Sequence, residues 1–509
     1  MAVNVQKRLI EKGYFPDEMG FWFSAKSFAN KISVIENQIS YNKRKMSKCY
    51  RFSTPKGQIN RREISLPNPY NYFFLTKEIA TKWNEIETQY NKSNISLTRP
   101  VFRNGSDRAI VRKYSFEDIT SIFLSKSVGA RYVLKTDISR YYESIYTHSI
   151  PWALHTKSVA KVNRGDSLTG NVLDGMSRNL QDGQTKGIPT GQDASLIISE
   201  IIGTAMDELI MQNVNCINAF RYVDDYYLFF DSREEAQKAL LRVREILREF
   251  ELQMNEEKTG IHEMPKALEP EWVSMINSLN IDENHLISFV NNVYSIMNKY
   301  PDEEVLRYAF SRLKRIKIKK NQWTIIEAFL LNSFIYDATA APLACSILSE
   351  FYHRKYGITK SKVLRVVETL LNKMESQDCE YELLWALWLC KLRKIKLEDD
   401  LLGKMENIKN PLIILVLLFD YRNNSNLNKT KWIDYMVEDE LYGPNWILAY
   451  EALKRGWLPS KNGMNYLEND DFFKVLYENN VTFFNVNCRD EWIYGHIEEK
   501  WLPMFSPAF

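Results

Sequence analysis

Strand-forming residues dominate two stretches of the chain, residues 131–136 and 220–230. Aromatic and β-branched side chains fill both stretches, and Asp224 and Asp225 interrupt the second one. Such side chains on both sides of a short polar turn predict a β-hairpin. We therefore expect these two carboxylates at the tip of a hairpin, and Asp137 at the end of a separate strand.

Helical periodicity begins directly after the hairpin. Ser232 and Glu235 have the spacing of a capping box, and apolar residues then recur at helical spacing as far as Phe250. We expect this helix to cover one face of the sheet that contains the hairpin.

Strand signals fade from about residue 266 onward, and amphipathic helices dominate the rest of the chain. The aromatic patterns that begin at Trp385 and Trp446 share the same seven-residue offset to a leucine. This offset suggests repeated helical hairpins of the HEAT kind. A length of 509 residues also predicts more than one domain. We expect a mixed α/β unit in residues 1–265 and an all-α unit in residues 266–509.

Charge and cysteine content narrow the class of protein. Lys and Arg total 67 against 64 Asp and Glu, which gives a formal net charge of +3. This balance excludes a polybasic nucleic-acid coat, so a DNA path must be a local patch such as residues 43–51 or 312–320, unless these runs are only solvated faces. The six cysteines show no Cys-x-x-Cys pair and no spacing to histidine that suggests zinc.

Membrane and export signals are weak in this sequence. The longest apolar run, residues 412–419, is too short to cross a bilayer, and the first residues lack the apolar core of a signal peptide. We therefore expect a cytoplasmic protein with reduced thiols and no membrane segment.

The adjacent carboxylates of Asp224 and Asp225 point to a metal ion. Two fixed negative charges side by side are costly unless a cation lies against them, and Mg²⁺ prefers hard oxygen ligands of this kind. Mn²⁺ is the alternative ion. The competing interpretation is that these residues and Asp137 are solvated turn and strand-end positions.

Further motifs follow one another in a definite order. After Asp137 come the turn-rich loop Gly-Ile-Pro-Thr-Gly-Gln-Asp at 187–193 and an apolar helical stretch at 196–210, then the Tyr-Val-Asp-Asp turn, then Asn-Glu-Glu-Lys-Thr-Gly at 255–260. This order resembles that of the reverse-transcriptase palm. The resemblance implies a fingers-and-palm fold, with an antiparallel palm sheet covered by helices, followed by the α-helical, HEAT-like domain.

The resemblance also implies a reaction and a set of metal ligands. In it, a hydroxyl attacks the α-phosphorus of a nucleoside triphosphate, and two metal ions neutralise the developing charge. Asp137 and Asp224 would hold both ions, the backbone carbonyl of Ile138 would assist, and Asp225 would be an outer partner.

Other roles follow from the same resemblance. Tyr142 lies where an aromatic residue closes against the sugar 2′ position and favours deoxynucleotides, although it could simply pack. Lys258 matches a lysine near the pyrophosphate that acts as general acid or charge partner, although it could be a surface residue. Thr190 and Gly191 would contact the incoming nucleotide or the strand it joins. Pro-Thr-Gly here replaces the Pro-Gln-Gly of many templated enzymes, which puts one base-pair contact in doubt.

Three arginines upstream of Asp137 would belong to a fingers region. Arg103, Arg108 and Arg112 are candidates for clamping triphosphate oxygens, because a guanidinium binds phosphate through two parallel hydrogen bonds. Surface salt bridging is the alternative for each of them.

Residues 146–152 and 157–164, together with the loop and hairpin motifs, resemble the bacterial abortive-infection reverse transcriptases of the AbiK type. That resemblance implies untemplated polymerisation of deoxynucleotides (dNTPs) from a tyrosine hydroxyl of the protein itself. It also implies a single-stranded DNA product attached covalently to the protein, a homo-oligomer, and a role in defence against bacteriophage.

The priming tyrosine is the least determined feature, since the chain has 28 tyrosines. Tyr14 lies beside Gly13 and close to Pro16, in an N-terminal segment that we expect to be mobile, and is the first candidate. Two other functions stay open: a templated RNA-directed DNA polymerase of the retron or intron type, and a non-catalytic polymerase-like scaffold.

Overall fold

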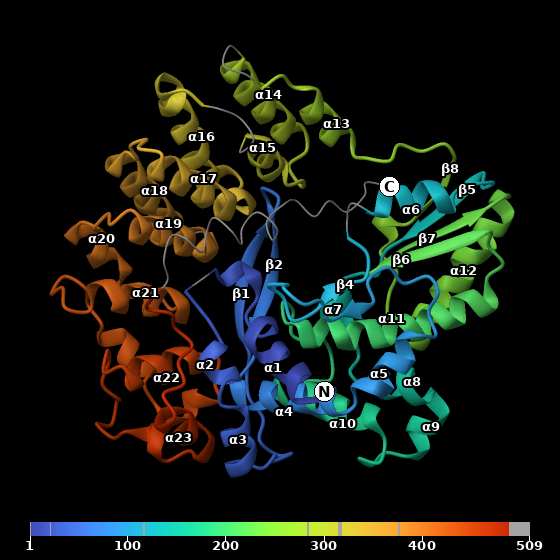
Figure 1. Cartoon of the computed structure of the whole chain (residues 1–509), viewed down its shortest axis with the longest axis horizontal. Coiled ribbons are helices and arrows are strands. Elements are labelled where there is room, and N and C mark those ends of the chain that lie inside the picture. Colours follow the sequence, from blue (N-terminus) through green and yellow to red (C-terminus); the bar gives the residue numbers. More distant parts are fainter. Residues whose placement is uncertain are drawn as a thin grey trace.

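A computed structural model describes residues 2–20, 22–115, 118–281, 285–313, 318–374 and 377–487. The chain runs from N-terminal helices and a long hairpin into a sheet region, and then through a series of helices that returns to the N-terminal helices (Figure 1). The fold class predicted from the sequence, a mixed α/β unit followed by a helical one, is confirmed.

A four-stranded antiparallel sheet forms the centre of the α/β unit. Its strand order is β6-β7-β5-β8. The strands are β5 (Tyr132–Thr136), β6 (Asn218–Tyr222), β7 (Asp225–Phe230) and β8 (Gly260–Glu263). In this register Thr136 lies opposite Tyr226 and Tyr222 lies opposite Asp225, so Asp137 and the β6–β7 turn meet at the same end of the sheet.

Helices cover both faces of this sheet. On one face, α12 (Arg233–Glu249) packs against β5 and β7, and α11 (Asp193–Asn213) packs against α12. The Ser232 hydroxyl accepts a hydrogen bond from the Glu235 N–H at the start of α12, as its position in the sequence predicted.

On the other face lies α6 (Asp118–Lys126). Its Phe123 ring packs against the rings of Phe220, Tyr227 and Phe229.

The remaining N-terminal elements surround the sheet. They are α1 (Ala2–Gly13), α2 (Lys26–Ala29), α3 (Ile32–Gln38), β1 (Tyr50–Lys56), β2 (Asn60–Leu66), α4 (Pro69–Thr81), α5 (Trp83–Tyr90), β3 (Pro100–Val101), β4 (Val111–Arg112), α7 (Tyr141–Ser144), α8 (Ser149–His155), α9 (Lys157–Val162) and α10 (Thr169–Asn179). Strands β1 and β2 form a hairpin of their own.

The chain after β8 is helical throughout its described part. The helices are α13 (Glu271–Ser278), α14 (Leu286–Lys299), α15 (Val305–Leu313), α16 (Trp323–Tyr336), α17 (Ala341–His353), α18 (Lys360–Lys373), α19 (Glu380–Leu392), α20 (Asp399–Lys404), α21 (Pro411–Tyr421), α22 (Trp446–Lys454) and α23 (Asp471–Glu478). Helix α18 contacts α16 and α19, and α21 contacts α19 and α22, which agrees with the predicted stacking of helical hairpins.

The helical region packs tightly on the N-terminal unit. The backbone N–H of Gln58, at the tip of the β1–β2 hairpin, donates to the Pro301 carbonyl at 2.8 Å, and Arg61 forms a 2.8 Å ion pair with Glu382. Farther along, the Ser24 N–H donates to the Phe483 carbonyl at 2.8 Å. The boundary at residue 266 stays a prediction, because one continuous apolar core crosses it.

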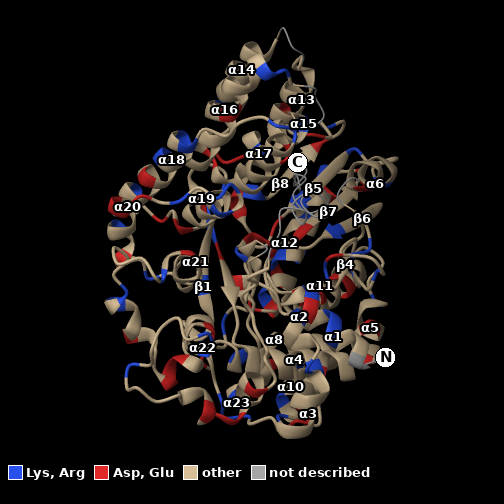
Figure 2. Cartoon of the chain, turned by 60° about the vertical axis from the view of Figure 1, so that its left-hand side comes forward, with Lys and Arg blue, Asp and Glu red and all other residues tan. Residues whose placement is uncertain are grey.

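Charged residues of both signs are interspersed over most elements (Figure 2). In the basic run 43–51, Lys45 pairs with Asp470, Lys48 with Asp182 and Arg51 with Glu63, and Lys43 pairs with Asp166. These ion pairs favour a structural role for this run over a role as a DNA path. In the second basic run, residues 314–317 lie outside the described part. None of the described helices is both long enough and apolar enough to cross a membrane.

Candidate metal centre and nucleotide site

Three carboxylates converge at one end of the sheet. Asp137 directly follows β5, Asp224 lies in the turn between β6 and β7, and Asp225 begins β7. Each offers one oxygen atom, and these three atoms lie within 4.8 Å of one another. Carboxylate oxygens at such separations can share a single hard cation. The donor set therefore fits Mg²⁺ or Mn²⁺.

The protonation of Asp224 reflects this crowding. Burial, followed by the negative charges of Asp225 and Asp137, raises the pKa of Asp224 to about 8. Like charges held in a partly desolvated site favour the neutral acid until a cation offsets them. Without such a cation, the arrangement is electrostatically unfavourable at neutral pH.

The segment 255–258 holds Asp137 in place. The Asn255 backbone N–H donates to the Asp137 carbonyl at 2.8 Å, and its side-chain amide donates to Asp137 Oδ2 at 2.8 Å. Lys258 Nζ lies 3.3 Å from the same Oδ2. Burial acts to lower the pKa of Lys258, but the carboxylates of Asp137 and Asp225 outweigh it and raise this pKa. Lys258 thus stays an ammonium beside the metal centre.

Tyr142 belongs to α7 and lies close to the carboxylates. Its hydroxyl accepts a hydrogen bond from Ser199 Oγ at 3.3 Å. Burial raises the pKa of Tyr142, and both Arg112 and Asp224 are near enough to influence it. The side chain is half-buried.

The structure separates the three predicted arginines. Arg112 extends over the Tyr222 ring, with its guanidinium carbon 5.0 Å from the ring centroid, and donates to the Tyr222 hydroxyl at 2.5 Å. Burial acts to lower the pKa of Arg112, but the neighbouring Tyr222, Tyr142 and Asp224 outweigh it and raise this pKa. Arg112 is therefore the arginine of the three that lies beside the carboxylates. Arg103 is exposed at a loop next to Arg8.

Arg108 is committed to internal contacts, which corrects its assignment as a triphosphate clamp. Its Nε donates to Asp193 at 3.1 Å, and its terminal nitrogens donate to the carbonyls of Phe15 and Gly191 and to Asp17. It braces the loop at 187–193 against the N-terminal segment.

Strand β2 is also hydrogen-bonded to the loop at 187–193. The Thr190 carbonyl accepts a hydrogen bond from the Ser65 N–H at 2.9 Å. Gly191 has φ +110°, and a Cβ at this position would lie 2.7 Å from a side-chain atom of Pro16. Glycine is thus required here for packing within the chain. A cavity of about 490 Å³ lies beside both the loop and β2, and Thr190, Ser65, Glu143 and Lys186 are among its lining residues.

The prediction of a mobile, accessible Tyr14 is wrong. Its side chain is 0% exposed, and its hydroxyl donates to the Pro67 carbonyl at 2.6 Å. The ring packs 4.6 Å from Tyr72 and 6.3 Å from Trp446, measured between centroids. A tyrosine in this position cannot present its hydroxyl to the metal centre.

Sequence reasoning assigned no role to Arg221, Asn255 or Ser199. The signal for Arg221 was a charged residue among the apolar residues of β6. Asn255 is the first residue of the Asn-Glu-Glu-Lys-Thr-Gly motif at 255–260. Ser199 gave no signal, because a serine within a helix commonly points to solvent or bonds only to a carbonyl of its own helix.

A known protein family matches the part of the chain that contains the three carboxylates. Residues 87–279 match the family model described as reverse transcriptase (RNA-dependent DNA polymerase). No curated protein matches the chain. Among solved structures, the chain is similar to apo telomerase from Candida tropicalis, with 12% identity, a TM-score of 0.32, and coverage of 81% of this chain and 73% of that one.

A second similar structure is telomerase from Candida albicans in complex with the TWJ fragment of telomeric RNA. Its identity is 11% and its TM-score is 0.30, with 70% of this chain and 69% of that chain covered. The matched range 87–279 contains all three converging carboxylates, Asp137, Asp224 and Asp225. Residues 87–279 therefore form a reverse transcriptase domain, and the protein is a nucleotidyltransferase, a reverse-transcriptase-like DNA polymerase.

Proposed function

We propose that this protein polymerises deoxynucleotides without a template, starting from a tyrosine of its own chain, and that it acts in abortive-infection defence against bacteriophage. The observation that carries the polymerase chemistry is the convergence of Asp137, Asp224 and Asp225 within 4.8 Å, beside the Lys258 ammonium. The branch assignment rests on the resemblance of residues 146–164 and the surrounding motifs to the AbiK type.

In this proposal Asp137 and Asp224 bind two Mg²⁺ or Mn²⁺ ions, with Asp225 and the Ile138 carbonyl as further oxygen partners. When bound, such ions activate an attacking hydroxyl and stabilise the leaving pyrophosphate. Asn255 orients Asp137 through its 2.8 Å amide contact, and so fixes the ligand before the ions arrive.

Lys258, Arg112 and Tyr142 act on the nucleotide. Lys258 holds a proton on Nζ next to Asp137, where it can donate to the leaving pyrophosphate. Arg112 contributes positive charge to the triphosphate. Tyr142 presents the edge of its half-buried ring to the sugar and excludes a 2′-hydroxyl. Thr190 and Gly191 border the strand that grows.

One feature supports synthesis without a template. Residues 264–281 contain no second hairpin after β8 that could grip a primer, since the chain passes directly to α13.

The resemblance extends the proposal to the whole protein. The DNA product stays attached to the priming tyrosine as a single strand, the protein acts in the cytoplasm, and several copies form a homo-oligomer. Residues 1–265 form the fingers and palm, and residues 266–509 form a HEAT-like domain that supports the product strand or neighbouring subunits.

The test is synthesis by the purified protein with Mg²⁺ or Mn²⁺ and labelled dNTPs alone. We expect label that stays attached to the protein after denaturation, with complete loss in Asp224→Ala. Asp434→Ala is a matched control, because Asp434 is an exposed aspartate paired with Lys461 in the helical region. Absence of any product without added template would contradict the proposal.

A second candidate function is templated synthesis on RNA. It is favoured by the description of the matching family as RNA-dependent DNA polymerase. Incorporation that requires an added RNA template, together with structured RNA that copurifies with the protein, would support this candidate over the first.

A further inference from the structure

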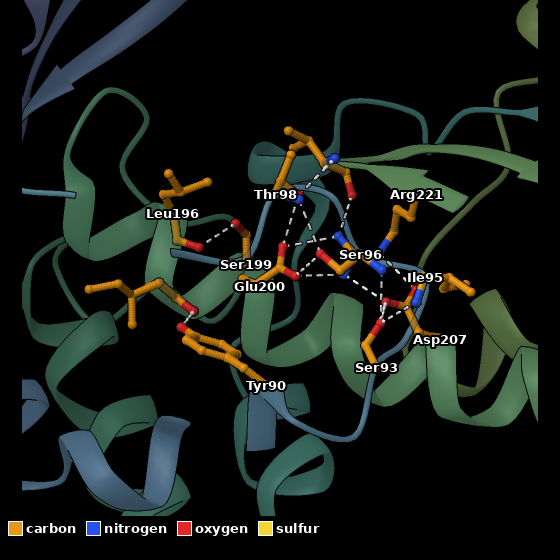
Figure 3. Close-up of polar contacts among 12 residues, drawn as sticks. Tyr90, Ser93, Ile95, Ser96, Thr98, Leu196, Ser199, Glu200, Asp207 and Arg221 are labelled. Carbon is orange, nitrogen blue, oxygen red and sulfur yellow. Dashed lines mark hydrogen bonds and ion pairs between the residues drawn. The ribbon is translucent and has the colours of Figure 1, made fainter. Parts of the chain in front are cut away.

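We propose that a buried network around Arg221 positions Asp224 for metal binding. This inference rests on the proposed function, because it assigns to residues outside the metal centre the task of fixing one ligand. The network links Arg221 of β6 to Glu200 and Asp207 of α11 (Figure 3). It also reaches the carbonyl of Val223, the residue before Asp224 in the turn.

All five N–H groups of the Arg221 guanidinium are used. Asp207 accepts from Nε at 2.7 Å and from one terminal nitrogen at 2.8 Å, and Glu200 accepts from both terminal nitrogens at 3.1 and 2.8 Å. The fifth donates to the Val223 carbonyl at 2.8 Å. Two carboxylates thus fix the guanidinium in a plane, and its remaining donor points at the turn.

Thr98 holds the other backbone polar group of Val223. Its Oγ1 accepts a hydrogen bond from the Val223 N–H at 3.1 Å and donates to Glu200 at 3.1 Å. Ser96 also donates to Glu200. Both backbone polar groups of Val223 are therefore hydrogen-bonded to one network that is anchored in α11.

Val223 needs this support because of its backbone conformation. It has φ +58°, a left-handed conformation that is unfavourable for a β-branched residue. Such conformations persist where the surroundings over-determine them, and they concentrate at functional sites. Asp224 follows directly in the chain, so the direction of its carboxylate depends on this conformation.

Gly203 of α11 makes room for the guanidinium. A Cβ at this position would lie 2.7 Å from Arg221 Cζ and 2.8 Å from a terminal nitrogen. Glycine in the middle of a helix is destabilising relative to alanine. Its presence at this contact fits the need for an arginine that lies against the helix.

The composition of the network also favours a positioning role over a purely stabilising one. Arg221, Glu200 and Asp207 are each at most 2% exposed, and together they carry one net negative charge if all are ionised. Buried ion pairs of this kind are often no more stabilising than apolar side chains of similar volume. What they supply here is a fixed orientation of the turn.

The experiment compares Mn²⁺ binding, followed by electron paramagnetic resonance, in the unchanged full-length protein and in single-residue variants of it. We expect Thr98→Val to bind Mn²⁺ about tenfold more weakly, which is the usual size of an effect of residues that orient a ligand. Thr98→Ser retains the hydroxyl and should bind within about twofold of the unchanged protein. Gly203→Ala displaces the guanidinium and should weaken binding as Thr98→Val does.

Glu327→Gln is the control for a general loss of stability. Glu327 is also a buried carboxylate, 2% exposed, and it accepts from Thr359 and Lys362 in the helical region. This variant should lower the melting temperature without changing Mn²⁺ affinity.

Different results would contradict the metal centre and the positioning role of the network. If the unchanged protein and Asp224→Ala bind Mn²⁺ equally, the proposed metal centre is wrong. If the unchanged protein binds Mn²⁺ through Asp224 but Thr98→Val and Gly203→Ala bind it equally well, the metal centre stands and the positioning role of the network is overturned.

Discussion

At the scale of single residues, the carboxylates of the metal centre lower the stability of the metal-free folded protein. The carboxylates of Asp137, Asp224 and Asp225 repel one another, and burial with this repulsion raises the pKa of Asp224 to about 8. In the unfolded chain an aspartate has a pKa of ~3.9. Between these values the folded protein retains a proton that the unfolded chain loses, so stability falls as the pH rises through this window. A divalent cation offsets the loss.

Asp224→Asn should therefore stabilise the metal-free protein. At pH 8 we expect the free energy of unfolding to rise by on the order of 1 kcal/mol, because solvent around the partly exposed side chain screens the repulsion. Melting curves with and without Mg²⁺ measure this effect. Mg²⁺ should raise the melting temperature of the unchanged protein and have little effect on that of the variant. A lower melting temperature of the metal-free variant would contradict this explanation.

Tyr142 should decide between deoxynucleotides and ribonucleotides. Removing its ring with Tyr142→Ala opens space at the sugar, so we expect the preference for dNTPs over NTPs, measured as the ratio of kcat/KM values, to fall by about tenfold or more. Tyr142→Phe keeps the ring and loses only the hydroxyl that meets Ser199 at 3.3 Å, and should retain most of the preference. Equal ratios in all three proteins would exclude this role.

The residues of the metal centre could be predicted because their types and order in the chain carry the information. The burial of Tyr14 and the internal ion pair of Arg108 could not be predicted. Burial of Tyr14 depends on Trp446, a residue of the helical region that is distant in the sequence. The pairing of Arg108 with Asp193 likewise depends on tertiary packing, and an arginine beside a phosphate looks the same in sequence as an arginine in an internal ion pair.

At the scale of elements, short segments at the ends of the central strands carry the function. The 3-10 turn Glu256–Lys258 follows Asn255, and together they bring an amide and an ammonium to Asp137. The central strands and helix α12 were predictable from periodicity. Hairpin β1–β2 was missed, because its mixed charged and polar sequence has little strand character and its stability comes from contacts with the helical region.

Lys258→Ala should slow nucleotide addition without weakening Mn²⁺ binding. We expect kcat for nucleotide addition to fall by about 10²-fold, the lower range for loss of a general acid, while Mn²⁺ affinity is retained. Because Asp137 and Asp225 raise the pKa of Lys258, the group stays protonated and available to donate across the neutral range. Single-turnover kinetics with a preformed primer measures the rate. Unchanged kcat would show that Lys258 is only a surface charge.

At the scale of the whole molecule, the helical region closes back onto the N-terminal helices. Glu451 is completely buried, pairs with Arg455 and accepts from the Phe483 N–H, and this fixes the segment that meets Ser24. Sequence periodicity predicted helices here and could not predict this closure, because the contacts join positions that are far apart in the chain.

We therefore expect the two predicted domains to unfold together. Residues 1–265 expressed alone should be unstable, because removal of the helical region exposes the apolar surface around Tyr14 and strand β1. Calorimetry of the full-length protein should show one cooperative transition. Two well-separated transitions, or a stable and monomeric 1–265 fragment, would contradict this view.

The most direct test of the central claim is anomalous X-ray diffraction from crystals soaked with Mn²⁺ and a non-hydrolysable dNTP. The account predicts manganese between the carboxylates of Asp137 and Asp224, with the triphosphate directed toward Lys258 and Arg112. Manganese bound elsewhere, with those carboxylates free of metal while nucleotide is present, would contradict it.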